Sequence, residues 1–281
     1  MDTDGRVLMA RCGTGGRARP RVTSRVMRAL CALLVATAVG CAWRAPAERA
    51  ASRVTSGGVP GMGAQYPCVP FHDAVYHGGP QAIPGRLENE YYDVMDVADE
   101  LKRSGVEEGF CYHDTDNRNS GSGAGALNGI GSFEKEFRMF ESGDVSYTKL
   151  HNANVAIDDS PYNLVKPDSN SLYLGWVAPG EWVRYTVNVT RAGEYSITTL
   201  YTSKFGGHIS IDVDGTDATG PLAIPSTFVA ADTVEWRQAH HWNKVSGVGR
   251  FYLPAGRHVL TLHFIDQPVF NFDWMEFLPV R

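Results

Sequence analysis

The sequence predicts an all-β fold, a jelly-roll β-sandwich, and three observations support this. Segments that alternate apolar and polar residues recur through the second half of the chain, the period of two that a strand needs when only one face is buried. Gly and Pro turn signals separate these segments about every ten residues, and helical periodicity is almost absent. Short strands with evenly spaced turns are typical of sandwiches and jelly rolls.

The clearest strands lie in residues 172–189. In the second of them Val183, Tyr185 and Val187 alternate with polar side chains, and residues 178–181 contain a Pro-Gly pair that favours a tight turn between the two strands. Trp176 stands beside this turn. A large aromatic there is either the edge of the core or a flat platform for a ligand, and residue type alone favours the core.

Further strands are predicted along the rest of the chain. Residues 195–202 alternate again, 208–213 run into an Asp-Gly turn, 249–253 and 258–265 flank a Pro-Ala-Gly turn, and 270–278 close the chain. One exception is residues 93–103, where Val94, Val97 and Leu101 fall at helical spacing and predict a short surface helix.

Residues 1–40 have the pattern of a secretory signal. Arginines precede an apolar run over residues 29–39 that is too short for a permanent membrane span. Residues 38–41 resemble a bacterial lipobox, which makes Cys41 a candidate for lipidation; ordinary signal-peptidase cleavage after Gly40 is the alternative. Residues 41–69 are predicted to be a flexible tether, and residues 70–281 a single domain. We therefore expect a secreted or cell-envelope protein with a lipid anchor.

The net charge of the chain limits the classes of molecule that it is expected to bind. Without residues 1–40 the chain loses seven arginines and two aspartates, which leaves 19 basic and 29 acidic side chains. Nucleic acids and anionic membrane surfaces are bound by clustered Lys and Arg, so neither is expected as the main partner. A neutral partner, or one reached through a cation, fits better, and membrane contact is expected only through the lipid anchor.

The cysteines predict one disulfide. Of five cysteines, two leave with the signal and Cys41 belongs to the tether, so Cys68 and Cys111 remain. Two such residues in an exported protein are usually paired. Closing a loop of about 44 residues stabilises a fold by about 4 kcal/mol in the chain-entropy description.

No catalytic constellation stands out, and no catalytic residue is predicted. His240 and His241 are adjacent, so on a strand they would point to opposite faces and bind one metal ion poorly. We expect them to be solvated loop residues. Residues 113–116 lack the Gly and the final Glu of an EF-hand loop.

Four stretches taken together resemble the family 6 carbohydrate-binding modules. They are residues 83–90 (IPGRLENE), 112–116 (YHDTD), 174–176 with 180–182 (LGW and GEW), and 270–274 (FNFDW). The resemblance covers roughly residues 70–281. It implies a galactose-binding-like jelly roll that binds polysaccharide without cleaving it and carries a structural calcium ion.

The resemblance also implies site residues. Trp176 and a second tryptophan would sandwich a sugar ring, with Asn271 hydrogen-bonding its hydroxyls. In the family the second tryptophan comes three residues before another; here Trp236 precedes Trp242 by six, so either can be the one that faces the sugar. Glu88, Glu90 and Asp273 would bind Ca²⁺, which prefers oxygen ligands.

We therefore predict a monomeric, non-catalytic polysaccharide-binding module. Two insertions relative to the family, roughly residues 93–108 and 121–167, keep two alternatives open. One is a glycoside hydrolase or polysaccharide lyase, or a fragment of one, that uses the insertions as an active site. The other is an adhesion or scaffold domain with a degenerate sugar cleft.

Overall fold

The computed structural model describes residues 66–72, 77–97, 106–116, 137–138, 141–148, 158–169, 171–268 and 270–281. All of these lie in one compact unit, Ser52–Arg281. In these ranges no helix is both long and apolar enough to span a membrane. The predicted signal and the lipidation candidate Cys41 lie outside the described residues.

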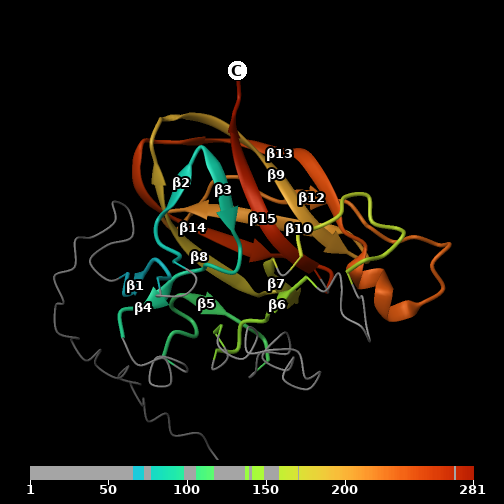
Figure 1. Ribbon diagram of the computed structural model, residues 1–281. Helices are drawn as coiled ribbons and strands as arrows, with labels where there is room; N and C mark the ends of the chain where they lie inside the picture. Colours follow the sequence, from blue (N-terminus) through green and yellow to red (C-terminus); the bar gives the residue numbers. More distant parts are fainter. Residues whose placement is uncertain are drawn as a thin grey trace, which may run out of the picture. The chain divides into compact units, whose positions relative to one another are not determined.

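Two sheets form a β-sandwich, as predicted (Figure 1). The first, called the β8 sheet, contains in order β11 (Thr216–Asp217), β10 (Gly207–Val213), β14 (Gly256–Phe264), β8 (Trp182–Val189) and β2 (Gln81–Ile83). In addition, β12 (Leu222–Ile224) pairs with β10 and β5 (Tyr112–His113) pairs with β8. The β2–β8 pair is parallel, and the other pairs of this sheet are antiparallel.

The second sheet, called the β15 sheet, contains in order β13 (Asn243–Leu253), β9 (Gly193–Ser203), β15 (Phe270–Pro279), β7 (Leu172–Val177) and β6 (Val145–Tyr147). Strand β3 (Gly85–Glu88) also pairs with β15. A separate small ladder joins β1 (Cys68–Val69) to β4 (Val94–Met95). A 3₁₀ helix, η3 (Glu235–His240), precedes β13.

The core lies between the two sheets. Val183, Tyr185 and Val187 of β8 are buried, as their alternation predicts, and they belong to one apolar cluster with residues of the β15 sheet such as Ile197 and Phe277. Burying a side chain of this size contributes about 1.5–3 kcal/mol. The two buried faces therefore hold the sandwich together.

The strands predicted in residues 172–189 are present, but they do not pair with each other. β7 pairs with β6 and β15, while β8 pairs with β14. The turn at residues 178–181 therefore carries the chain from one sheet to the other. Glu181 N–H donates to the Ala178 carbonyl (3.2 Å), and Gly180 takes a φ of +94°, which glycine adopts without steric cost.

Two predictions at the start of the domain are wrong. Val94 and Met95, expected in a helix, form strand β4, because the buried Asp93 carboxylate accepts hydrogen bonds from Thr186 and Tyr66 and holds this segment beside β8. Residues 98–103 of the predicted helix lie outside the described residues. The predicted tether ends earlier than expected, because Tyr66 makes this bond to Asp93 and Cys68 lies in strand β1.

Cys68 and Cys111 form the predicted disulfide, with their Cα atoms 5.7 Å apart. Cys111 directly precedes β5, which pairs with β8. The covalent bond therefore attaches the first ladder to the β8 sheet.

Candidate functional site

A second, smaller apolar cluster lies on the β15 sheet, separate from the sandwich core. Its buried members come from β7, β9, β15 and the residue pair that follows η3: Tyr173, Leu200, Trp274 and Trp242. Trp242 is completely buried, lies edge-on to Tyr173 with ring centroids 5.2 Å apart, and donates its indole N–H to Asp158 (2.7 Å). This cluster anchors the chain segment that contains η3.

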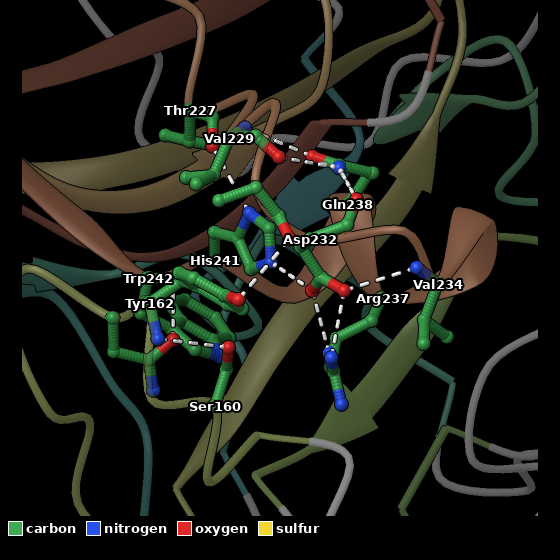
Figure 2. A network of polar contacts seen from close by, with 12 residues as sticks. Ser160, Tyr162, Thr227, Val229, Asp232, Val234, Arg237, Gln238, His241 and Trp242 are labelled. Atoms are coloured by element: carbon green, nitrogen blue, oxygen red, sulfur yellow. Dashed lines mark hydrogen bonds and ion pairs between the residues drawn. The ribbon is translucent and has the colours of Figure 1, made fainter.

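The buried carboxylate of Asp232 binds side chains of η3 and of the residue that follows it (Figure 2). Asp232 accepts two hydrogen bonds from the Arg237 guanidinium, both 2.6 Å long, and lies 2.8 Å from Nε2 of His241. The hydrogen bonds from Arg237 hold the pKa of Asp232 below its usual range. A bidentate arginine–carboxylate pair has a defined geometry, so the short helix is fixed relative to Asp232.

Two residues of η3, Gln238 and Ala239, make further hydrogen bonds to their surroundings. Gln238 donates to the carbonyls of Val229 and Asp232 (2.9 and 2.7 Å), and the Ala239 carbonyl accepts from the Thr202 hydroxyl (2.6 Å). The helix is thus bound both to its own loop and to strand β9.

Trp176, Trp236 and His240, which we call the aromatic site, meet at the end of η3. The His240 ring lies edge-to-face with both indoles, with centroid distances of 6.3 Å to Trp176 and 6.2 Å to Trp236. The two tryptophans are 38% and 53% exposed, while His240 is only 8% exposed. Exposed indoles beside a buried polar ring form a surface suited to a ligand with an apolar face and polar edges.

Trp176 has an unusual backbone conformation. Its φ is +53°, a region that residues other than glycine rarely occupy. Asn271 stabilises this conformation, because its amide oxygen accepts the Trp176 N–H (3.0 Å). Strained backbone of this kind tends to occur at functional sites.

Asn271 itself is only 2% exposed. Its amide nitrogen donates to the Thr202 hydroxyl (2.9 Å) and to the Ala239 carbonyl (2.8 Å). Both amide hydrogens, which we expected to face a sugar, are therefore used inside the protein. In this structure Asn271 connects β15 to Trp176 at the end of β7 and to Ala239 in η3, so it positions the aromatic site.

The structure also distinguishes between the two candidate tryptophans. Trp236 projects from η3 into solvent, whereas Trp242 is enclosed in the second apolar cluster. The expectation that His240 and His241 are solvated is wrong. His241 is 1% exposed, and its two ring nitrogens face the Thr227 carbonyl and Asp232.

The predicted calcium ligands lie where β15 pairs with β3, further along the same edge of β15 that pairs with β7. Burial raises the pKa of Glu90, and its proximity to Glu88 and Asp273 raises it further. Burial, with a contribution from Glu88, raises the pKa of Asp273 to about 7. The three carboxylates therefore interact. Glu90 lies beyond the end of β3 at Glu88, so the alternation of side chains along a strand does not explain its position.

The donor set suits calcium in its chemistry. One carboxylate oxygen of Glu90 is fully buried with no hydrogen-bond partner among the described residues, an arrangement that is costly unless a cation or a proton compensates it. However, no three acidic, histidine or cysteine side chains in the described part of the chain are close enough to hold a metal ion as they stand. Hard carboxylate oxygens nevertheless match the preference of Ca²⁺.

A cavity of about 390 Å³ lies elsewhere, on the β8 sheet. Its lining combines acidic, histidine and apolar residues, among them Gly180, Ser210, Asp212, Asp217, His263 and Ile265. None of these is an exposed aromatic ring, so the apolar face of a sugar has no stacking surface there.

Sequence reasoning missed two residues of the site, Asp158 and the role of His240. A signal for His240 was present in the sequence, because this residue lies between Trp236 and Trp242, where the spacing is longer than in the family. Asp158 lies within the insertion at residues 121–167, and no local pattern indicates that it approaches His240. Much of that insertion lies outside the described residues.

Comparison with known proteins identifies one family. The sequence model described as carbohydrate binding module (family 6) matches residues 146–279. No curated protein matches the chain significantly. The predicted strands, the aromatic site and Asp273 all fall within the matched residues or at their border.

Several solved structures are similar to the chain at low identity. A family 43 arabinoxylan arabinofuranohydrolase from Bacillus subtilis, in complex with cellotetraose, is 14% identical over 75% of this chain, with a TM-score of 0.39; this chain covers 33% of its length. A module of Cellvibrio mixtus lichenase 5A, in complex with cellotriose, is 22% identical over 39% of this chain and 79% of its own, with a TM-score of 0.31. A β-1,3-glucan-binding module from Bacillus halodurans is 26% identical over 40% of this chain and 81% of its own, with a TM-score of 0.32.

Proposed function

Because residues 146–279 of this chain belong to the family 6 carbohydrate-binding modules, which bind polysaccharides, we propose that the aromatic site is where this protein binds its polysaccharide. The observation that carries the proposal is the pair of exposed indoles, Trp176 and Trp236, that both pack edge-to-face against one histidine, His240. Both tryptophans lie within the family match.

Sugar chemistry supports this assignment. One face of a pyranose ring consists of C–H groups and stacks on an indole, while its hydroxyl groups need hydrogen-bond partners at the edge. The site offers two indole faces, and the basic side chains of Lys204 and Arg237 beside it are paired with Glu235 and Asp232. A neutral polysaccharide therefore fits it better than a polyanion.

Retention on insoluble polysaccharide tests the proposal. Cellulose, an insoluble β-1,3-glucan and insoluble arabinoxylan are suitable, since similar proteins are described with cello-oligosaccharides, β-1,3-glucan and arabinoxylan. We expect the wild type to be retained on at least one, and Trp176→Ala and Trp236→Ala to lose retention while keeping the wild-type melting temperature within a few degrees. Tyr252→Ala is the matched control, because Tyr252 is 60% exposed but lies on β13.

Measurements on the same binding assays distinguish the hydrolase, lyase and scaffold alternatives. Reducing-sugar release would favour a hydrolase, and a rise in ultraviolet absorbance from unsaturated ends would favour a lyase. Absence of retention on every polysaccharide would support the scaffold alternative and contradict the proposed function. Loss of folding in Trp176→Ala would show that this tryptophan is part of the core.

We also propose that Glu88, Glu90 and Asp273 hold a structural calcium ion. The unpartnered buried oxygen of Glu90 and the mutual effect of the three carboxylates on their pKa values support it. Arg86 lies 3.7 Å from Glu88, and a bound cation would add positive charge beside the buried Glu90 and Asp273 and would join β3 to β15. Binding to the folded state alone stabilises a protein by mass action.

Thermal unfolding with and without chelator tests the calcium site. We expect chelation to lower the melting temperature, added calcium to restore it, and Glu90→Gln to abolish the difference. Glu194→Gln, on the exposed surface of β9, should respond as the wild type does. A melting curve that is insensitive to both chelator and calcium would contradict the site.

Finally, we propose that the chain is exported and anchored through lipidated Cys41. The arginine-rich leader with its apolar run supports export, and so does the disulfide, since such bonds persist mainly in oxidising compartments. Expression with labelled palmitate should label the wild type and not Cys41→Ser. Label in both would place the lipid elsewhere, and label in neither would favour ordinary cleavage.

A further inference from the structure

His240 differs from an ordinary buried histidine in the partners of its ring. Asp158, which is completely buried, places a carboxylate oxygen 3.2 Å from Nδ1 of His240. The same oxygen accepts the indole N–H of Trp242 (2.7 Å). Because Trp242 is itself enclosed in the second apolar cluster, Asp158 is held in place and in turn fixes the plane of the His240 ring.

The other ring nitrogen of His240, Nε2, has no hydrogen-bond partner among the described residues. This nitrogen is not one of the fully buried, unpartnered side-chain atoms of the described residues, so it retains access to solvent. The two nitrogens lie on different edges of the imidazole ring. With Nδ1 directed at Asp158, Nε2 is directed away from it, and the ring packs against both indoles.

The neighbouring histidine provides an internal comparison. Both nitrogens of His241 are satisfied within the protein, by the Thr227 carbonyl and by Asp232, as expected for a residue whose role is only to fix the loop. His240 has one satisfied nitrogen and one accessible nitrogen, although its side chain is only 10% exposed. A polar atom left open in this way, between two exposed tryptophans, is suited to a ligand.

We propose that His240 is a direct polysaccharide contact, in which Nε2 hydrogen-bonds a sugar hydroxyl while the indoles of Trp176 and Trp236 contact the sugar. The inference rests on the function proposed above and assigns the polar contact within that site. The Asp158 carboxylate accepts a hydrogen bond from Nδ1–H, and in the neutral imidazole this tautomer leaves Nε2 as an acceptor for a hydroxyl hydrogen. Asp158 is a positioning residue, because it acts through His240.

Two amide substitutions separate the sugar contact from the structural contact. An asparagine side chain ends near the position of Nδ1, and a glutamine side chain reaches the position of Nε2. His240→Asn should keep the contact with Asp158 and lose the sugar contact. His240→Gln should do the reverse.

The two variants are compared by titration calorimetry with a soluble β-1,3-glucan and soluble arabinoxylan, and by thermal unfolding. We expect His240→Asn to bind about three- to tenfold more weakly than the wild type, the effect of losing one hydrogen bond, with little change in melting temperature. His240→Gln should bind within about twofold of the wild type and melt at a lower temperature. His241→Gln serves as the control for disturbance of the loop.

Three outcomes would overturn the inference. Wild-type affinity in His240→Asn, with affinity lost in Trp176→Ala, would show that the site binds sugar without His240. Equal loss of affinity in both amide variants, accompanied by loss of stability, would make His240 a positioning residue. A wild type that binds neither soluble nor insoluble polysaccharide would remove the proposed function and this inference together.

A spectroscopic measurement on the wild-type protein completes the test, and it does not depend on whether a variant folds. The side-chain nitrogen resonances of His240 are followed by NMR during titration with the same polysaccharide. We expect the Nε2 resonance to move by several parts per million and the Nδ1 resonance to stay nearly constant. An unmoved Nε2 signal at saturation would contradict a direct contact.

Discussion

Replacing Trp242 by alanine should damage the fold, whereas the same change at Trp236 should damage only binding. Trp242 is completely buried, and its ring lies against Tyr173 in the second apolar cluster. Removing a buried tryptophan costs about 3–5 kcal/mol. The substitution also takes from Asp158 the indole N–H that it accepts (2.7 Å), and a hydrogen bond to a charged group contributes about 1.5–3 kcal/mol.

The sum is on the order of 5 kcal/mol, which is a large fraction of the 5–15 kcal/mol that stabilises a typical domain. With a urea m-value of about 2 kcal/mol per molar, the unfolding midpoint should fall by about 2.5 M. Trp242→Phe keeps most of the ring and removes the N–H, so its midpoint should fall by about half as much. Trp236→Ala, at a residue that is 53% exposed, should leave the midpoint nearly unchanged.

Urea unfolding followed by circular dichroism measures these shifts, and retention on polysaccharide is measured on the same preparations. The reasoning would be refuted by a Trp242→Ala protein that unfolds at the wild-type midpoint but no longer binds polysaccharide. That result would mean that Trp242, and not Trp236, faces the ligand.

Three further predictions concern the position of Asn271, the disulfide and the calcium site. In Gly175→Ala the new Cβ would lie 2.9 Å from the amide oxygen of Asn271, so we expect polysaccharide affinity to fall several-fold in calorimetry, and unchanged affinity would contradict the positioning role of Asn271. Reducing the disulfide between Cys68 and Cys111 should destabilise the fold by about 4 kcal/mol, measured as a lower melting temperature in reductant; identical melting curves would argue against it. The pKa of Asp273 is about 7 in the folded protein and about 3.9 in an unfolded chain, so without calcium the stability should fall as pH rises from about 4 to about 7. Calcium binds the deprotonated form, so its effect on the melting temperature should be larger at pH 8 than at pH 5, and an equal effect at both would contradict the site.

The sequence by itself determined which side chains are buried in the main strands and which two cysteines are bonded. In β8, alternation alone identified Val183, Tyr185 and Val187 as core residues, because side-chain direction along a strand is a local property. The pairing of Cys68 with Cys111 followed from counting the cysteines that remain after the leader. Both inferences need no knowledge of which strands are neighbours.

Only the tertiary structure decided how these strands pair and which tryptophan is exposed. Alternation does not identify the partner of a strand, so β7 and β8 resembled a paired unit although they belong to different sheets. Trp236 and Trp242 have the same chemistry, and they differ only because Tyr173, Leu200 and Trp274, from three other strands, enclose one of them. The carboxylate partner of His240 is Asp158, 82 positions earlier in the chain. The energy of such a contact depends on the distance between the two side chains in space, and the order of residues does not give that distance.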